Sequence, residues 1–191
     1  MSRRYVGHLH FDGTPEQMIA RARVGDQPWF IKIHEHEFPE DEKAIYVVRD
    51  GRAAMASYRN FQRDIGKRDF SLEDIVSGKP PLVSWSEHVR WGLERSRETT
   101  LLLHYEELTC PSQDTFARIA AFTGLPVLRP FDVEFGELHA VRPELYGKGS
   151  NESGIAEVET RCSDLFWRVN GDAMQALGYS RGVNVPSPIE T

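Results

Sequence analysis

Cysteine is scarce in this sequence, and that scarcity limits how the chain can be stabilised. The 191 residues include two cysteines, Cys110 and Cys162. Two are too few for a disulfide framework, and their separation fits no zinc-binding pattern. We expect two free thiols in a reducing, cytoplasmic setting, so the chain must depend on a packed apolar core.

Long apolar runs and excess positive charge are also lacking. No run approaches the roughly 20 apolar residues that cross a bilayer, and the basic start at residues 1–6 has no apolar stretch behind it to form a signal peptide. The net charge of −6 argues against a general nucleic-acid binder. We therefore expect neither membrane nor nucleic acid as a partner, and an anionic ligand would need a local cluster of cations.

The sequence does have the composition of a soluble globular protein, with 40% hydrophobic and 27% charged residues. The length and the lack of repeats indicate one domain over residues 1–191. Apolar runs predict strands at 29–33, 44–48 and 100–104, and helical patterns follow from 52, around 71–74, and over 85–97, 114–123 and about 157–177. Alternating strands and helices predict an α/β fold with a parallel sheet flanked by helices, where ligands bind at the carboxyl ends of strands.

A cation and a hydroxyl follow the second of these strands. Arg49 comes directly after the run that ends at Val48, and Ser57 lies inside the next predicted helix. A guanidinium offers a planar fork to phosphate oxygens, and a hydroxyl can complete the coordination. The alternative from these residues alone is that Arg49 forms a structural ion pair with Asp50 and that Ser57 only packs.

The run from Arg49 to Arg52, with Ser57 and Tyr58, resembles the 3′-phosphate-binding motif of sulfotransferases that use 3′-phosphoadenylyl sulfate (PAPS). In that family the arginine and the serine hold the 3′-phosphate. Residues 102–108 resemble the family's strand ending in Tyr-Glu-Asp-Leu, and the resemblance implies that Tyr105 contacts adenine. It also implies the family's P-loop NTPase-like architecture, with PAPS as co-substrate and no metal.

Two later segments extend the resemblance. Residues 134–138 are similar to a segment whose phenylalanine, here Phe135, flanks the adenine. Residues 146–149 resemble an Arg-Lys-Gly element that closes over the 3′-phosphate, which assigns Lys148 and Gly149 to that site. Gly147 stands where the family has arginine, and Val133 where a hydroxyl residue often contacts adenine, so nucleotide binding should be weakened.

Residues 30–35 resemble the family's Lys-Thr-His segment. By that resemblance His34 is the general base, and Lys32 stabilises charge on the transferred sulfate. An imidazole near its ordinary pKa of about 6.5 can accept a proton at neutral pH. The residues alone also fit an alternating strand that runs into a polar loop. His34 and His36 could also suggest a metal site, but no third ligand lies at a supporting spacing.

One family feature has no counterpart in the sequence. The family's Pro-Lys-Ser-Gly-Thr-Thr loop, whose backbone N–H groups surround the 5′-phosphosulfate, matches no run of residues here. Three interpretations remain open: an N-terminally incomplete sequence, a degenerate replacement at residues 5–15 with Thr14 as N-cap and Pro15 as first helical residue, or a protein that does not turn over. Either residues 5–11 replace the missing central strand, or the isolated chain is unstable, aggregated or completed by another chain, as in a homo-oligomer.

The resemblance thus predicts transfer of a sulfuryl group from PAPS to a hydroxyl or amine of a small molecule or glycan. The alternative is a catalytically impaired or truncated sulfotransferase-like protein that binds nucleotide or a partner without turnover. A nucleoside or sugar kinase is disfavoured because the sequence has no Gly-Lys-Ser/Thr loop. The acceptor cannot be identified, since acceptor pockets are built from variable loops such as residues 66–81.

Overall fold

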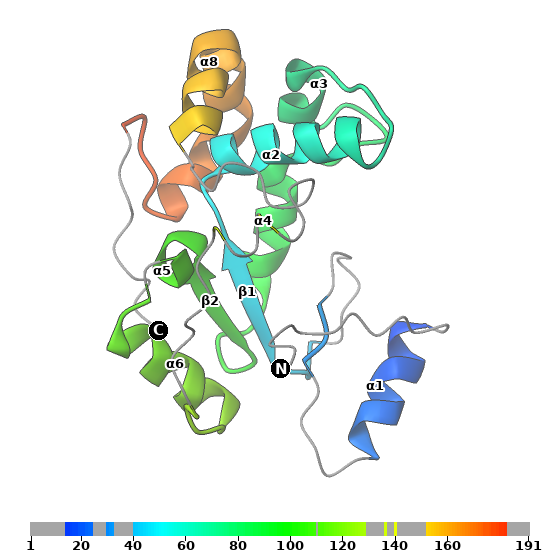
Figure 1. The fold of residues 1–191 in the computed structure, drawn as a ribbon, viewed down its shortest axis with the longest axis vertical. Helices are drawn as coiled ribbons and strands as arrows, with labels where there is room; N and C mark the ends of the chain where they lie inside the picture. The colour runs from blue at the N-terminus through cyan, green and yellow to red at the C-terminus, as the bar shows by residue number, and fades with distance from the viewer. Residues whose placement is uncertain are drawn as a thin grey trace. The chain divides into compact units, whose positions relative to one another are not determined.

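The structure of the chain is a computed structural model that describes residues 14–24, 30–32, 40–109, 111–128, 136, 140 and 152–182. The chain divides into two compact units, Met1–Pro39 and Glu40–Thr191. Figure 1 labels the helices and strands of both units, which are described separately below.

The N-terminal unit contains one described helix, α1 (Pro15–Arg23). Its start confirms the predicted cap. The Thr14 hydroxyl accepts from the Gln17 N–H at 3.4 Å, and the Gln17 side chain accepts from the Thr14 N–H at 3.0 Å. The strand predicted at 29–33 is not found in its described part, because residues 30–32 have no regular secondary structure. Phe30 is 71% exposed, which is incompatible with a strand buried in a parallel sheet.

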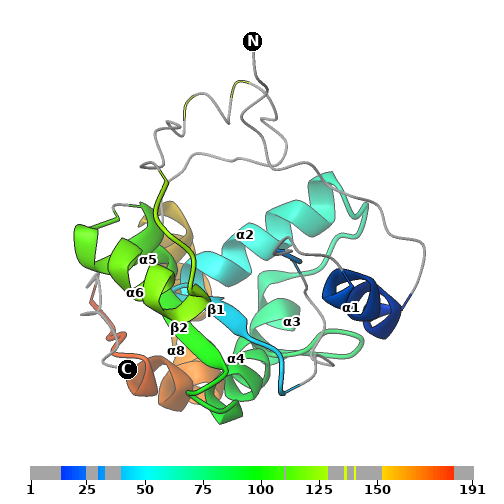
Figure 2. The same cartoon turned by 90° about the horizontal axis from the view of Figure 1, so that it is seen from below.

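The second unit is built on two parallel strands, β1 (Ala44–Val48) and β2 (Thr100–His104). Their pairing runs from Ala44 opposite Thr100 to Val48 opposite His104. Every residue of β2 is buried, whereas β1 buries Tyr46 and Val48 and exposes Ile45 and Val47. With the helices around it, this parallel pair confirms the predicted α/β class (Figure 2).

Six described helices accompany the strands: α2 (Gly51–Asp64), α3 (Leu72–Ser77), α4 (Trp85–Glu94), α5 (Tyr105–Thr109), α6 (Gln113–Thr123) and α8 (Glu152–Ala176). Their ends follow local sequence signals. The Ser71 hydroxyl accepts from the Asp74 N–H at 3.0 Å, and Gly124 ends α6 in the left-handed conformation with φ of 72°. α4 is shorter than the predicted 85–97, because Arg95 has an extended backbone.

The last helix differs from its prediction in both start and shape. It begins at Glu152 rather than near residue 157, and it is interrupted at Cys162, whose φ of −149° and ψ of 32° are not helical. After α8, Gly178 takes a positive φ of 78°, so the predicted stop at this glycine is confirmed. No helix among the described residues has the length and apolar character to span a membrane.

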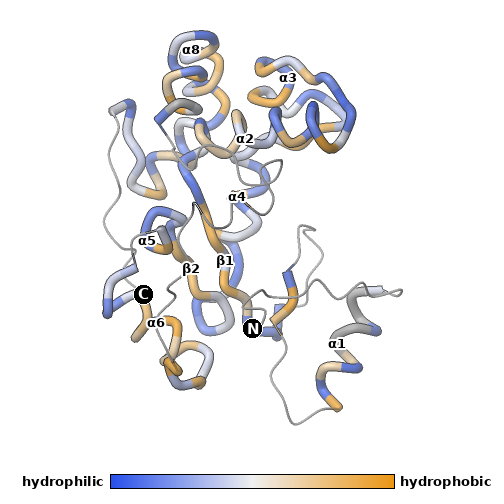
Figure 3. The backbone as a smooth tube through the Cα atoms, in the orientation of Figure 1, coloured by the Kyte–Doolittle hydropathy of each residue, from blue (hydrophilic) through white to orange (hydrophobic). Residues whose placement is uncertain are grey.

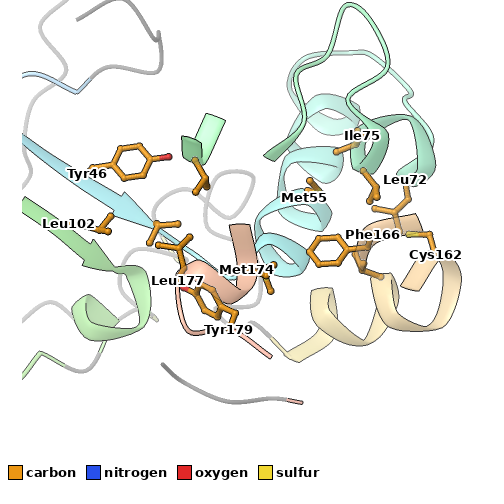
Figure 4. Close-up of a cluster of buried hydrophobic side chains, with 14 residues drawn as sticks. Tyr46, Met55, Leu72, Ile75, Leu102, Cys162, Phe166, Met174, Leu177 and Tyr179 are labelled. Atoms are coloured by element: carbon orange, nitrogen blue, oxygen red, sulfur yellow. The ribbon is translucent and has the colours of Figure 1, made fainter. Parts of the chain in front are cut away.

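One apolar core joins the strands to the helices. Figure 4 shows Tyr46 and Leu102 from the strands near Leu177 and Tyr179, with Phe166 and Met174 from α8 beyond them. The hydropathy colouring of Figure 3 shows both strands as largely apolar and the helices as mixed. Helices α2 and α8 approach closely, since a Cβ placed on Gly154 would lie 3.1 Å from the Ala56 Cβ.

Candidate nucleotide site at the carboxyl ends of the strands

The strand register brings together two residues that the sequence analysis placed in one site. Because Val48 and His104 are paired, Arg49 and Tyr105 are the next residues beyond the sheet on adjacent strands. The Arg49 guanidinium carbon lies 4.8 Å from the centre of the Tyr105 ring, in cation–π geometry. Both residues are half-buried, so they present a cation and an aromatic face at the edge where α/β folds bind ligands.

The start of α5, which carries Tyr105, is fixed by Glu107. This buried carboxylate accepts from the His104 N–H at 3.0 Å and from Arg118 of α6 at 2.6 Å. Arg118 also donates to the carbonyl of Leu102 at 3.2 Å. The Tyr105 backbone is therefore held from the strand before it and from the helix after it.

Glu106 links the two strand ends. One of its oxygens accepts from the Asp50 N–H at 3.4 Å, and the other accepts from the Tyr179 hydroxyl at 2.9 Å. Burial raises the pKa of Tyr179, and the charge of Glu106 raises it further, so the hydroxyl stays protonated and donates. Neither Glu106 nor Tyr179 was assigned a role from the sequence.

The turn after β1 is organised by Asp50 and Arg52. Asp50 is the N-cap of α2 and accepts from the Arg52 N–H at 2.9 Å. Its two oxygens also accept from the Arg52 guanidinium, at 3.1 and 2.7 Å. Asp50 therefore forms a buried ion pair with Arg52 in this turn.

Ser57 lies on α2, about 9 Å along the helix axis from Gly51 at a rise of about 1.5 Å per residue. Ser57 is exposed and is not part of the buried core. It therefore lies on the surface of the helix whose N-cap, Asp50, directly follows Arg49.

The positions of the other predicted site residues relative to Arg49 and Tyr105 are not described. Lys32 is exposed and belongs to the N-terminal unit. The remaining four, His34, Phe135, Lys148 and Gly149, lie outside the described residues, as do Val133, Gly147 and the segment 5–11. Within the described part of the chain, no group of three His, Cys, Asp or Glu side chains could hold a metal ion.

Comparison with known proteins gives the family. A family model described as the sulfotransferase domain matches residues 7–135, which is more than half of the chain. The chain belongs to this family. Among the described site residues, the matched region includes Lys32, Arg49, Ser57 and Tyr105.

Individual sulfotransferases match over shorter stretches. The chain is 30% identical to human Sulfotransferase 1C2 over 123 residues, which are 57% of this chain and 42% of that protein. It is 29% identical to human Sulfotransferase 2B1 over 97 residues, 47% of this chain and 27% of that protein. The chain therefore spans less than half of the length of these relatives. A solved structure of mouse sulfotransferase SULT7A1 complexed with PAP matches with a TM-score of 0.48 and 22% identity, covering 70% of this chain and 63% of that one.

Proposed function

We propose that this sulfotransferase-family chain binds PAPS and transfers its sulfuryl group to a hydroxyl or amine of a small molecule or glycan. The observation that carries the proposal is the contact between Arg49 and Tyr105 at the carboxyl ends of the paired strands. In the proposed complex Arg49 and Ser57 bind the 3′-phosphate, with Lys148 and Gly149 closing over it. Tyr105 and Phe135 hold the adenine between aromatic faces.

In the proposed reaction the acceptor oxygen or nitrogen attacks the sulfur of PAPS. The bond between sulfur and the bridging oxygen of the 5′-phosphate breaks, and 3′,5′-adenosine bisphosphate leaves. His34 takes the acceptor proton as general base. Lys32 offsets the negative charge that develops on the bridging oxygen.

A second candidate is nucleotide binding without turnover. It is favoured by one sequence observation: no Pro-Lys-Ser-Gly-Thr-Thr run is present to surround the 5′-phosphosulfate. The residues proposed for the nucleotide end are unaffected by that departure. Binding of the nucleotide is therefore common to both candidates, and only turnover separates them.

Calorimetric titration with 3′,5′-adenosine bisphosphate tests the shared step. Arg49→Ala is expected to raise the dissociation constant about tenfold or more, since a charge-assisted contact contributes about 1.5–3 kcal/mol. Arg63→Ala is the control, because Arg63 is an exposed arginine near the end of α2 that pairs with Asp64. Equal affinities of the wild type and Arg49→Ala would overturn the assignment of the 3′-phosphate site.

A further inference from the structure

Arg52 is a fully buried cation at the centre of a hydrogen-bond cluster in the second unit. Its exposed fraction is 0%. The guanidinium donates to carboxylates of two elements and to main-chain carbonyls beyond α8. The acceptors are Asp50 Oδ1 (3.1 Å) and Oδ2 (2.7 Å), Glu159 Oε1 (2.6 Å), and the carbonyl oxygens of Ser180 (3.0 Å), Arg181 (3.0 Å) and Gly182 (3.2 Å).

The aromatic surroundings restrict the guanidinium further. The centre of the Trp167 ring, on α8, lies 5.4 Å from the guanidinium carbon of Arg52 and 5.4 Å from the guanidinium carbon of Arg181. The Trp167 Nε1–H donates to Glu159 Oε1 at 3.0 Å, the same oxygen that accepts from Arg52. A planar fork with several fixed acceptors and an aromatic neighbour cannot be reproduced by a lysine.

The segment held by Arg52 also reaches the other strand end. Before that segment, the carbonyl of Leu177 accepts from His104 Nε2 at 3.0 Å. The Tyr179 hydroxyl donates to Glu106 at 2.9 Å. Residues 177–182 therefore contact the chain next to Tyr105, while Arg52 ties them to the turn next to Arg49.

We propose that Arg52 is a positioning residue that sets the placement of Arg49 over Tyr105. It fixes Asp50, which directly follows Arg49, and it docks residues 180–182 against the start of α2. The proposal rests on the proposed function in one respect, namely that Arg49 and Tyr105 hold the nucleotide. Arg52 itself has a fully buried side chain, so it acts through Arg49 and is not expected to contact ligand.

Two substitutions test this role in the full chain. Arg52→Gln removes the fork, and Asp50→Asn keeps an N-cap acceptor for α2 but removes the charge that pairs with Arg52. Asn170→Ala is the matched control, because Asn170 is a buried polar residue of α8 that bonds to Ser86 and Val76. All variants are compared at a temperature at which circular dichroism shows them folded.

The first readout is the affinity for 3′,5′-adenosine bisphosphate. We expect Arg52→Gln to raise the dissociation constant about tenfold or more through displacement of Arg49, and Asp50→Asn to raise it less. Asn170→Ala should lose stability with an affinity within about twofold of wild type. If Arg52→Gln bound with wild-type affinity, or if Asn170→Ala lost as much affinity as Arg52→Gln, the positioning role would be overturned.

The second readout does not depend on nucleotide binding. In an NMR spectrum of the ¹⁵N-labelled chain, the Tyr105 ring should shift the Arg49 Nε–H signal upfield, and Arg49→Lys identifies that signal. We expect the signal to move downfield in Arg52→Gln and Asp50→Asn, and to stay in place in Asn170→Ala. If the wild type did not bind the nucleotide, the proposed function would fail, while this signal would still decide the positioning role. If Arg52→Gln did not fold, Asp50→Asn would decide it, and an unchanged signal there would overturn the proposal.

Discussion

At the scale of single residues, the strand register explains why residues from two motifs distant in sequence are in contact. Arg49 and Tyr105 were assigned to a phosphate and to an adenine from separate segments. In the structure they touch, because each directly follows the last paired residue of its strand. The tyrosine ring packs against the arginine in the unliganded chain, and in the proposed complex this contact would lower the ordering cost of binding.

The face of the Tyr105 ring, and not its hydroxyl, should account for the contribution of this residue to nucleotide affinity. We expect Tyr105→Phe to bind 3′,5′-adenosine bisphosphate within about twofold of wild type, since a phenyl ring also stacks on a base and on a guanidinium. Tyr105→Ala should weaken binding about tenfold, because stacking on one base contributes about 1–3 kcal/mol. Calorimetry measures both constants. Equal losses in the two variants would contradict a role for the ring face.

Glu159 gives a prediction about pH. Burial raises its pKa, but hydrogen bonds from Ser163, Arg52 and Trp167 outweigh burial and hold the pKa below its ordinary value of 4.5. A lowered folded-state pKa means that the carboxylate stabilises the fold above pH 4.5 and that this contribution is lost as the pH falls through the lower folded value.

Glu159→Gln should therefore lower the free energy of unfolding at neutral pH by about 1.5–3 kcal/mol, the contribution of hydrogen bonds to a charged group. The difference in Tm between wild type and Glu159→Gln should shrink as the pH is lowered below 4.5. Thermal melts from pH 7 downward measure it, with exposed Glu98→Gln as a control that should change Tm little throughout. A difference that grew at low pH would contradict the assignment.

At the scale of elements, the sequence predicted the features that depend on neighbouring residues, namely the positions of strands and the ends of helices. Continuous apolar runs located both strands, and capping residues such as Ser71 and Gly124 located helix ends. The interruption of α8 at Cys162 has no glycine or proline to mark it. The partners of Arg52 could not be predicted either, because Glu159 and Ser180 lie 107 and 128 positions away in the sequence.

The packing of α4 on β1 gives a prediction at the same scale. A Cβ on Gly92 would lie 2.5 Å from the buried Tyr46 ring, whose hydroxyl bonds to His88 Nδ1 at 2.8 Å. A Cβ on Gly171 of α8 would meet Trp167 at an ordinary 3.6 Å. Both glycines lie inside helices, where alanine is favoured over glycine by about 1 kcal/mol. A difference in stability between the two alanine variants therefore reports the clash with the Tyr46 ring.

We therefore expect Gly171→Ala to raise the midpoint of urea unfolding. Gly92→Ala should lower it, because overpacking costs about 1–3 kcal/mol and displacement of the Tyr46 ring also breaks its buried hydrogen bond. Similar stabilisation by the two substitutions would show that the ring at Tyr46 can move without cost and that α4 is not fixed by this contact.

At the scale of the whole molecule, the chain has more of the family's binding residues for the nucleotide end of the proposed co-substrate than for its sulfuryl end. For the nucleotide end, the proposal assigns Arg49, Ser57 and Tyr105, which all lie in the described second unit. For the sulfuryl end, the proposal assigns Lys32 and His34 of the N-terminal unit, and the sequence has no family-type loop to provide backbone donors. We therefore expect the chain to bind the nucleotide even where its rate of sulfuryl transfer is low.

This separation leads to a kinetic prediction for the 191-residue chain. Losing one donor that stabilises transition-state charge costs about 10²–10³ in rate, and the family's loop supplies several. We expect 3′,5′-adenosine bisphosphate to bind, while transfer from ³⁵S-labelled PAPS to 4-nitrophenol and a panel of simple alcohols and amines stays far below the range of about 1–10³ per second found for typical enzymes. A slow transfer that His34→Ala abolishes would favour the proposed sulfotransferase, whereas binding with no transfer would favour the binding protein. Transfer within the usual enzymatic range would contradict the prediction, and its loss in Thr14→Ala would then show that the segment ending at Thr14 replaces the loop.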